Sequence, residues 1–268
     1  MRIALVVLMV AGLFPLVLAL VAHRRTSLFH ALVWTLIAWV SWGLTLAFAD
    51  PADSDFAPAR YWALCLTGCA GIAVLGARRP QVFAWNFVVL GLLAVMIWPL
   101  VETLVIGTPP VAGLRIAFLA GTVAVAALNY LPTRFGPAAL VLLVACAGEL
   151  VLLVAPTSLP RIGDATIFDA LLAIVPWLGW GCLRTQPAEG SDFDRLWLRF
   201  RDSWGFMWSQ RVREQFNHAA QNAGWAVRLS WRGLVEEKQT PTALPADQEK
   251  LVELLWATLQ RFVETEEG

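Results

Sequence analysis

The chain has 268 residues, of which 58% are hydrophobic and 15% are charged, and its mean hydropathy is +0.64. A soluble domain carries about 25% charged residues, so this composition excludes an ordinary soluble domain and is typical of a membrane protein. Basic and acidic residues number 20 each, so the net charge indicates no partner. The only two lysines, Lys238 and Lys250, lie in the polar C-terminal part, which excludes a retinal Schiff base in the membrane.

Seven apolar runs fill the first 183 residues. A hydrocarbon core of about 30 Å needs about 20 apolar residues in a helix, and most of the runs approach that length. The first run is interpreted as a retained span and not as a signal peptide, because its arginines follow it. The third run is short and Gly-rich, and is the least certain span. The sequence therefore predicts an all-α integral membrane protein, a bundle of about seven transmembrane helices at residues 3–22, 28–48, 61–77, 82–101, 111–131, 137–155 and 167–183.

Arginines in the connecting loops predict the orientation, because short cytoplasmic loops are enriched in Lys and Arg. The loops after the first, third and fifth runs contain five arginines, and the polar tail opens with another, Arg184. The loops on the other side contain two arginines and four aspartates. We therefore expect the N-terminus outside and the C-terminus in the cytoplasm, in a chain of the cytoplasmic membrane. The loop residues are Arg24, Arg25, Arg78, Arg79 and Arg134 on one side, and Arg60, Arg161, Asp50, Asp53, Asp55 and Asp164 on the other.

Four ionisable residues within or beside the spans form a candidate polar cluster: Glu102, Arg115, Glu149 and Asp169. Glu149 lies in the apolar run 137–156, where a carboxylate is costly unless it is paired, protonated or facing a polar cavity. In the predicted topology all four lie in the outer half of the membrane, and Glu102 and Arg115 flank one short hairpin as natural partners. One arginine for three carboxylates leaves excess negative charge. Two hypotheses stay open: a buried pair that fixes helix register, or a cation pathway, proton pathway or polar pocket.

A stripe of small residues lies along the fifth run. Gly113, Ala117 and Gly121 are spaced by four and share one helix face. Because small residues let helix backbones approach each other, we expect a neighbouring helix to pack on this face.

No residue pattern indicates a catalytic centre, a metal or a cofactor. The four cysteines lie in or beside apolar runs without a CxxC motif, as expected of small buried side chains. His23 and His30 could meet across a turn as haem or metal ligands, but no further ligand accompanies them and interfacial histidines are the favoured interpretation. The chain contains no GxSxG, HExxH, P-loop or GxGxxG motif.

The composition changes at residue 184, where residues 184–190 are predicted to form a linker and residues 191–268 a small α-rich cytoplasmic region with minor β structure. Ser191 and Asp194 have the spacing of a capping box, at the start of an amphipathic helix expected over 192–222. Residues 225–231 alternate apolar and polar, which predicts a strand, and 234–237 could return as a second one. A linker at 240–245 and a final helix over 246–264 complete the region.

The amphipathic helix combines an aromatic face with arginine flanks, which is typical of a helix that lies on a membrane surface or packs on a partner. Residues 184–232 carry a net charge of +3 and residues 236–268 a net charge of −5. We therefore expect the basic part at the anionic leaflet. Nucleic acid is not an expected partner, because acids interleave with the arginines and no reader motif is present. The candidate contacts with the bilayer or with a protein partner are Trp197, Arg199, Trp204, Trp208 and Arg211.

These observations favour a non-enzymatic scaffold, assembly or sensory protein whose cytoplasmic region contacts a partner protein or the inner leaflet. The alternative, from another functional class, is a transporter or channel that uses Glu149, Arg115 and Asp169. A membrane-embedded enzyme is the third hypothesis.

Overall fold

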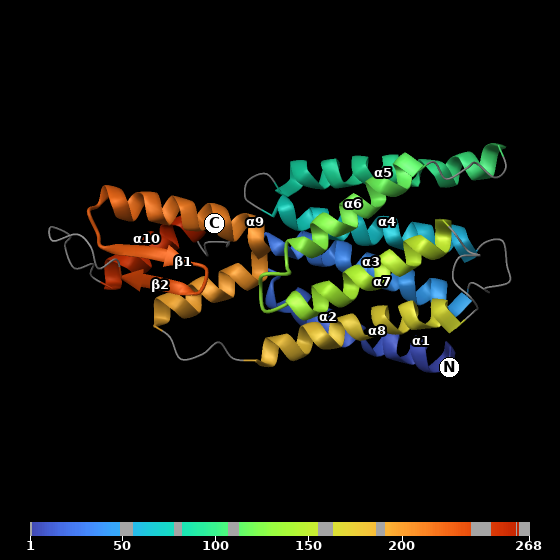
Figure 1. Cartoon of the computed structure of the whole chain (residues 1–268), viewed down its shortest axis with the longest axis horizontal. Helices are drawn as coiled ribbons and strands as arrows, with labels where there is room; N and C mark the ends of the chain where they lie inside the picture. Colours follow the sequence, from blue (N-terminus) through green and yellow to red (C-terminus); the bar gives the residue numbers. More distant parts are fainter. Residues whose placement is uncertain are drawn as a thin grey trace.

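The computed structural model describes residues 2–48, 56–77, 82–106, 113–154, 163–185, 191–236, 248–260 and 262. These residues form an elongated helical bundle that continues at one end into a smaller unit with a two-stranded sheet (Figure 1). The predicted helical bundle is confirmed. Within the described ranges, six helical stretches are long and apolar enough to cross a membrane: Arg2–Ala22, Leu28–Phe48, Ala57–Leu75, Phe83–Glu102, Gly136–Val154 and Thr166–Arg184.

The bundle helices run lengthwise, so the N-terminus and the smaller unit, called the tail below (residues 191–262), lie at opposite ends (Figure 1). The bundle consists of α1 (Arg2–Ala11), α2 (Leu13–Ala22), α3 (Leu28–Phe48), α4 (Phe56–Leu75), α5 (Val82–Ile106), α6 (Gly113–Leu128), α7 (Gly136–Val154) and α8 (Gly163–Arg184). The tail consists of α9 (Asp192–Asn222), β1 (Val227–Ser230), β2 (Gly233–Glu236) and α10 (Gln248–Leu259).

Apart from α1 and α2, which together form one apolar stretch of 21 residues, the shortest of these helices is α6, with 16 residues. At 1.5 Å per residue it spans about 24 Å, less than a hydrocarbon core of about 30 Å. The third predicted span, α4, is instead a full 20 residues long. It starts before the apolar run because Arg60 lies inside the helix, where it is buried against two carboxylates. By length, the described part of α6, and not α4, is shorter than a hydrocarbon core.

The helices α1 and α2 form one helical segment that is interrupted at Gly12. Pro15 lacks the N–H that a continuous helix needs and disfavours regular geometry in the turn before it. At this interruption the Trp39 indole of α3 donates a hydrogen bond of 2.9 Å to the carbonyl of Met9. A Cβ atom on Gly12 would lie 2.8 Å from the same indole, so the glycine allows α3 to approach.

The helices α4 and α6 pack tightly at Gly71, where an added Cβ would lie 3.0 Å from the Cα of Ala126. The stripe of Gly113, Ala117 and Gly121 is exposed, and no described residue lies within 4 Å of a Cβ placed on either glycine. The expectation that a helix packs on this stripe is wrong. The face of α6 that is buried carries larger side chains, which bury more apolar area than the glycines would.

In the tail, α9 has the bounds of the amphipathic segment identified in the sequence, and Ser191 caps it. The Ser191 hydroxyl accepts a hydrogen bond of 3.2 Å from the backbone N–H of Asp194, which satisfies one of the free donors of the first turn. Near its middle α9 bends sharply at Gly205, which has φ 75° and ψ −169°. Both halves extend away from the bundle, with the bend against the bundle end (Figure 1).

The rest of the tail packs on α9. The strands β1 and β2 form an antiparallel hairpin in which Val227 pairs with Glu236 and Ser230 with Gly233. The side chain of Asp194 accepts a hydrogen bond of 2.8 Å from Leu234, which ties β2 to the start of α9. The apolar side of α10 is buried at Leu251, Leu255 and Leu259.

Some predicted features lie outside the described residues. These are most of both linkers, the arginines Arg78, Arg79 and Arg161, the aspartates Asp50, Asp53 and Asp55, and the last residues of the final helix.

Candidate functional site

The first candidate site is an ionic triad of Arg60, Glu149 and Asp169, contributed by α4, α7 and α8. Arg60 Nη1 pairs with Glu149 Oε2, and Arg60 Nη2 lies 2.8 and 3.0 Å from the two oxygens of Asp169. Glu149 is fully buried, and Arg60 and Asp169 are 3% and 7% exposed. Three ionised or ionisable groups therefore meet where water is largely excluded.

The local sequence brings α8 close to α7 at the level of the triad. Gly148 precedes Glu149, and a Cβ atom on it would overlap the ring of Phe168, the neighbour of Asp169. A larger side chain at position 148 would therefore push α8 away. The glycine thus places the two carboxylates within reach of one guanidinium.

The four residues predicted as one polar cluster lie in two places. Glu102 and Arg115 form a separate, partly exposed pair between α5 and α6, with Nη1–Oε2 and Nη2–Oε1 distances of 2.6 and 3.1 Å. Glu149 and Asp169 are joined to Arg60 and not to Arg115. The sequence interpretation assigned Arg60 to a loop. The signal that could have identified it was the excess of carboxylates in the predicted cluster, which required a second cation at similar depth.

The second candidate site is the junction, where the bend of α9 meets the bundle end. Asn129, just after α6, forms hydrogen bonds with both halves of α9. Its backbone oxygen and its Oδ1 accept hydrogen bonds of 2.7 and 3.0 Å from the N–H groups of Phe206 and Met207, and its Nδ2 lies 3.5 Å from the carbonyl of Trp204. One asparagine therefore satisfies helix-end groups on both sides of Gly205.

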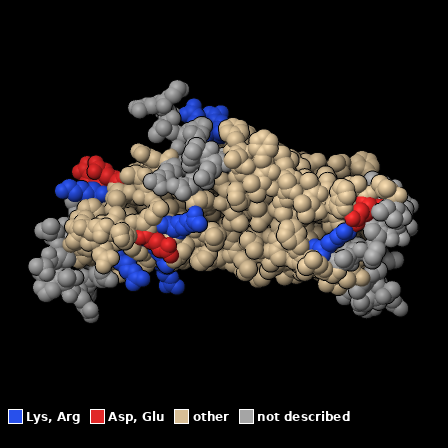
Figure 2. Space-filling view, turned by 90° about the horizontal axis from the view of Figure 1, so that it is seen from above, with Lys and Arg blue, Asp and Glu red and all other residues tan. Residues whose placement is uncertain are grey.

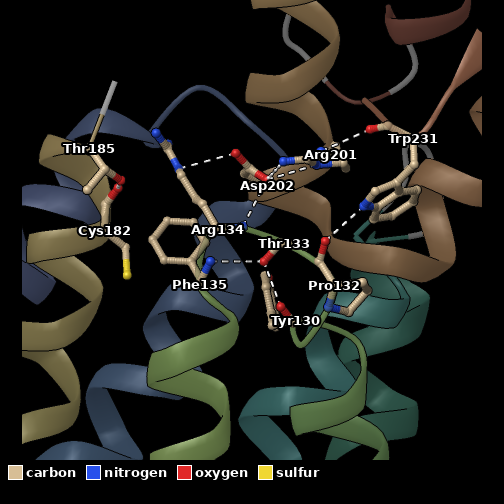
Figure 3. A network of polar contacts seen from close by, with 10 residues as sticks. All are labelled: Tyr130, Pro132, Thr133, Arg134, Phe135, Cys182, Thr185, Arg201, Asp202 and Trp231. Carbon is tan, nitrogen blue, oxygen red and sulfur yellow. Dashed lines mark hydrogen bonds and ion pairs between the residues drawn. The ribbon is translucent and has the colours of Figure 1, made fainter. Parts of the chain in front are cut away.

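A charged network extends the junction along the loop between α6 and α7 (Figure 3). Asp202, which is 2% exposed, lies between two arginines, with 3.3 Å to Arg134 Nε and 2.7 Å to Arg201 Nη2. The Trp231 indole points to the same loop and donates a hydrogen bond of 2.8 Å to the carbonyl of Pro132. The tail therefore contacts this loop through both α9 and the hairpin.

Two tryptophans of α9 donate hydrogen bonds to the C-terminal end of α4. The Trp204 and Trp208 indoles donate hydrogen bonds of 3.2 Å to the carbonyls of Ala77 and Val74. Carbonyls at a helix C-terminus lack partners within the helix, so indole donors suit them.

These contacts correct the expectation that the indoles of α9 touch a leaflet or a partner. Trp197, Trp204 and Trp208 are buried inside the chain, because the aromatic face covers the bundle end and the core of the tail. Arg199 and Arg211 of the same candidate set are exposed. Of the five candidate contact residues, the two arginines therefore remain available for an external contact.

The end of α10 is also attached to the bundle. Ser27, in the loop between α2 and α3, donates from its backbone N–H to the carbonyl of Phe262 at 3.2 Å and from its hydroxyl to that of Ala77 at 2.9 Å. The Phe262 ring lies 5.0 Å from Phe200 and 5.2 Å from Trp208. Segments far apart in the sequence thus share one aromatic cluster at the junction.

His23 belongs to the junction. Its ring lies edge-on to Trp204 at 6.3 Å, and burial lowers the pKa of His23 below its usual value, so the imidazole is neutral at pH 7. His30 instead packs between Phe29 and Phe83. Over the described ranges, no three His, Cys, Asp or Glu residues are grouped as metal ligands.

The tail also has an open groove of about 860 Å³ between the start of α9 and α10. Trp256 in this groove is 44% exposed. The charged groups that line it are Asp192, Arg195, Glu249 and Glu253.

No known protein family, curated protein or solved structure matches this chain. The ionic triad, the junction and the groove are therefore the features from which its function is inferred.

Proposed function

We propose that this chain is a seven-span membrane protein of the scaffold, assembly or sensory class, which presents its cytoplasmic tail to a protein partner. The junction carries this proposal. Three bundle loops or helix ends hold the tail through hydrogen bonds, between Ser27 and Phe262, between Ala77 and Trp204, and between Asn129 and Met207. A tail held in this way keeps a fixed position relative to the bundle, which suits a surface that positions a partner.

A membrane location is supported by the distribution of charge on the surface. On the face drawn in Figure 2, charged side chains gather over the tail and at the opposite end, with uncharged side chains between them. An uncharged band between charged ends is what a bilayer requires. We count α6 as a span in addition to the six longer ones, which gives seven in total. Its Arg115 is paired with Glu102 and can reach the interface from a short helix.

The arginines at the tail end support the proposed orientation. Arg24, Arg25 and Arg184 are exposed there, and the positive-inside rule assigns that end to the cytoplasm. Because Arg60 is buried in the ionic triad, it no longer counts as a loop arginine on the other side.

Single cysteines test this orientation in a Cys182→Ser background, since the other three native cysteines are buried. Cysteine at Ser54 is expected to react with a membrane-impermeant maleimide in intact cells. Cysteine at Gln221, an exposed residue of α9, is expected to react only after lysis. The opposite pattern would reverse the topology, and equal labelling at both positions in intact cells would contradict membrane insertion.

The groove is the surface that we propose for the partner. Glu249 and Glu253 line it together with the exposed Trp256, and its third acidic side chain, Asp192, is paired with Arg195. A protein segment with basic residues around an apolar side chain complements this arrangement.

Photo-crosslinking tests the groove in native membranes. A photoreactive phenylalanine analogue at position 256 is expected to form one stoichiometric adduct, and the same probe at Gln221, outside the groove, none. The double change Glu249→Lys and Glu253→Lys is expected to abolish the adduct, because it reverses the charge that attracts the partner. Adducts of equal yield at both positions, or none at either, would contradict the proposal.

A transporter or channel is the second candidate, and the buried carboxylates of the ionic triad favour it. It ranks second because Arg60, Glu149 and Asp169 are closed off from solvent and bonded to one another.

A further inference from the structure

The ionic triad contains one carboxylate more than its guanidinium neutralises. Arg60 Nη2 donates hydrogen bonds to both oxygens of Asp169, and Nη1 donates only to Oε2 of Glu149. The remaining oxygen, Glu149 Oε1, is buried and has no hydrogen-bond partner in the part of the chain that the structure describes. The triad therefore has one buried acceptor atom without a donor.

The helices packed against α7 offer Glu149 little further compensation. The charged groups that face it are Arg60 from α4 and Asp169 from α8. The single charged residue of α6, Arg115, is paired with Glu102. The positive charge of Arg2, in α1, interacts electrostatically with Asp169, and the Nε of Arg2 donates a hydrogen bond to the carbonyl of Leu46. On α7 itself the nearby titratable group is the thiol of Cys146, which is neutral when protonated and supplies no positive charge.

The free oxygen can accept a proton but is unsuited to a metal ion. Ca²⁺ takes six to eight oxygen ligands, and Mg²⁺ requires an octahedral set. The triad has only Oε1 free, because its other three carboxylate oxygens already accept from Arg60. A proton needs one atom, and it removes the cost of an unpaired buried charge, which is larger than the cost of an unpaired neutral hydroxyl.

We propose that Glu149 binds a proton on Oε1 at neutral pH, so that the ionic triad is a proton-binding site inside the bundle. The bound proton converts Glu149 to a carboxylic acid whose Oε2 still accepts from Arg60, and Asp169 stays ionised. The triad is then neutral. Release of the proton leaves one net negative charge between α4, α7 and α8, which weakens their packing. This inference goes beyond the scaffold function proposed above and does not rest on it.

Infrared spectroscopy of the full-length protein in detergent tests the inference directly, because a carboxylic acid and a carboxylate absorb at different frequencies. The wild type is expected to show a carboxylic acid C=O band at neutral pH, and Glu149→Gln is expected to lose it. The matched control Glu102→Gln removes a partly exposed, paired glutamate and is expected to keep the band. Absence of the band from the wild type, or its persistence in Glu149→Gln, would overturn the proposal.

Two further measurements apply if Glu149→Gln does not fold. In Asp169→Asn, Glu149 is the only acidic side chain left beside Arg60, so Glu149 is expected to lose its proton. The carboxylic acid band is then expected to disappear at neutral pH. A band of full intensity in this variant would refute the assignment. In a His23→Gln background, which removes the opposing titration of the buried His23, the thermal midpoint is expected to fall from about pH 6 to about pH 9, because the folded chain retains a proton that the unfolded chain releases. A midpoint that rises over this range would refute it as well.

Discussion

Replacing Arg60 with methionine is expected to lower the free energy of unfolding by about 3–5 kcal/mol, because Glu149 and Asp169 are buried and lose the guanidinium that both of them bind. The side chains of Arg60 and Glu149 are 4% and 0% exposed, so water does not replace the lost partner. The measurement is reversible unfolding of the purified protein in mixed detergent micelles, followed by tryptophan fluorescence.

Two variants separate the loss of the ion pair from the loss of the side chain. Adding Glu149→Gln and Asp169→Asn to Arg60→Met removes both carboxylates, so most of the stability is expected to return. Arg115→Met breaks the exposed pair with Glu102, and is expected to cost clearly less than Arg60→Met. Equal losses in Arg60→Met and Arg115→Met would show that the ionic triad does not contribute through its burial.

Replacing Gly205 with alanine is expected to release the tail from the bundle. The backbone of Gly205, with φ 75° and ψ −169°, lies in a region that only glycine adopts readily. The new Cβ would also lie 2.7 Å from Cγ of Asn129. Backbone strain and overpacking together are expected to destabilise the contact between the tail and the bundle by roughly 2–5 kcal/mol. Limited proteolysis is expected to cut the variant in or before the tail at enzyme concentrations that leave the wild type intact.

Gly224→Ala is the matched control for this experiment. Gly224 also has a positive φ, 70°, but an added Cβ there meets no atom within 4 Å. The substitution therefore introduces backbone strain after α9 without disturbing the junction. Its tail is expected to resist proteolysis at the bundle end. Release of the tail in Gly224→Ala as well, or in neither variant, would show that the contact between Gly205 and Asn129 does not hold the tail.

The junction changes how the aromatic residues of α9 are understood. An amphipathic helix with tryptophans on one face and arginines around it has the same sequence pattern whether that face lies on lipid, on a partner or on its own chain. The structure decides between these, because Trp204 and Trp208 donate to carbonyls at the end of α4, more than 120 residues earlier in the sequence. The exposed arginines and the groove at Trp256 remain for external contacts.

Features that depend on near neighbours in the chain could be predicted from the amino-acid order. Apolar runs predicted the bundle helices, and the Ser191 cap and the alternation at 225–231 predicted the start of α9 and the β1 strand. The pairing of Glu102 with Arg115 was also predictable, because the two residues flank one hairpin and are 13 positions apart. Periodicity, capping and hairpin pairing are local, so they can be recognised without knowing which helices are neighbours.

Contacts between distant residues depend instead on how the helices pack together. Arg60 lies 89 and 109 positions from its partners Glu149 and Asp169, and this pairing depends on α7 and α8 packing together at Gly148. The bend at Gly205 depends in the same way on Asn129, which belongs to another helix hairpin. A glycine or an arginine has the same local preferences wherever it stands. Its role in a packed bundle is set by the atoms that other segments bring against it, and these contacts have no periodicity along the chain.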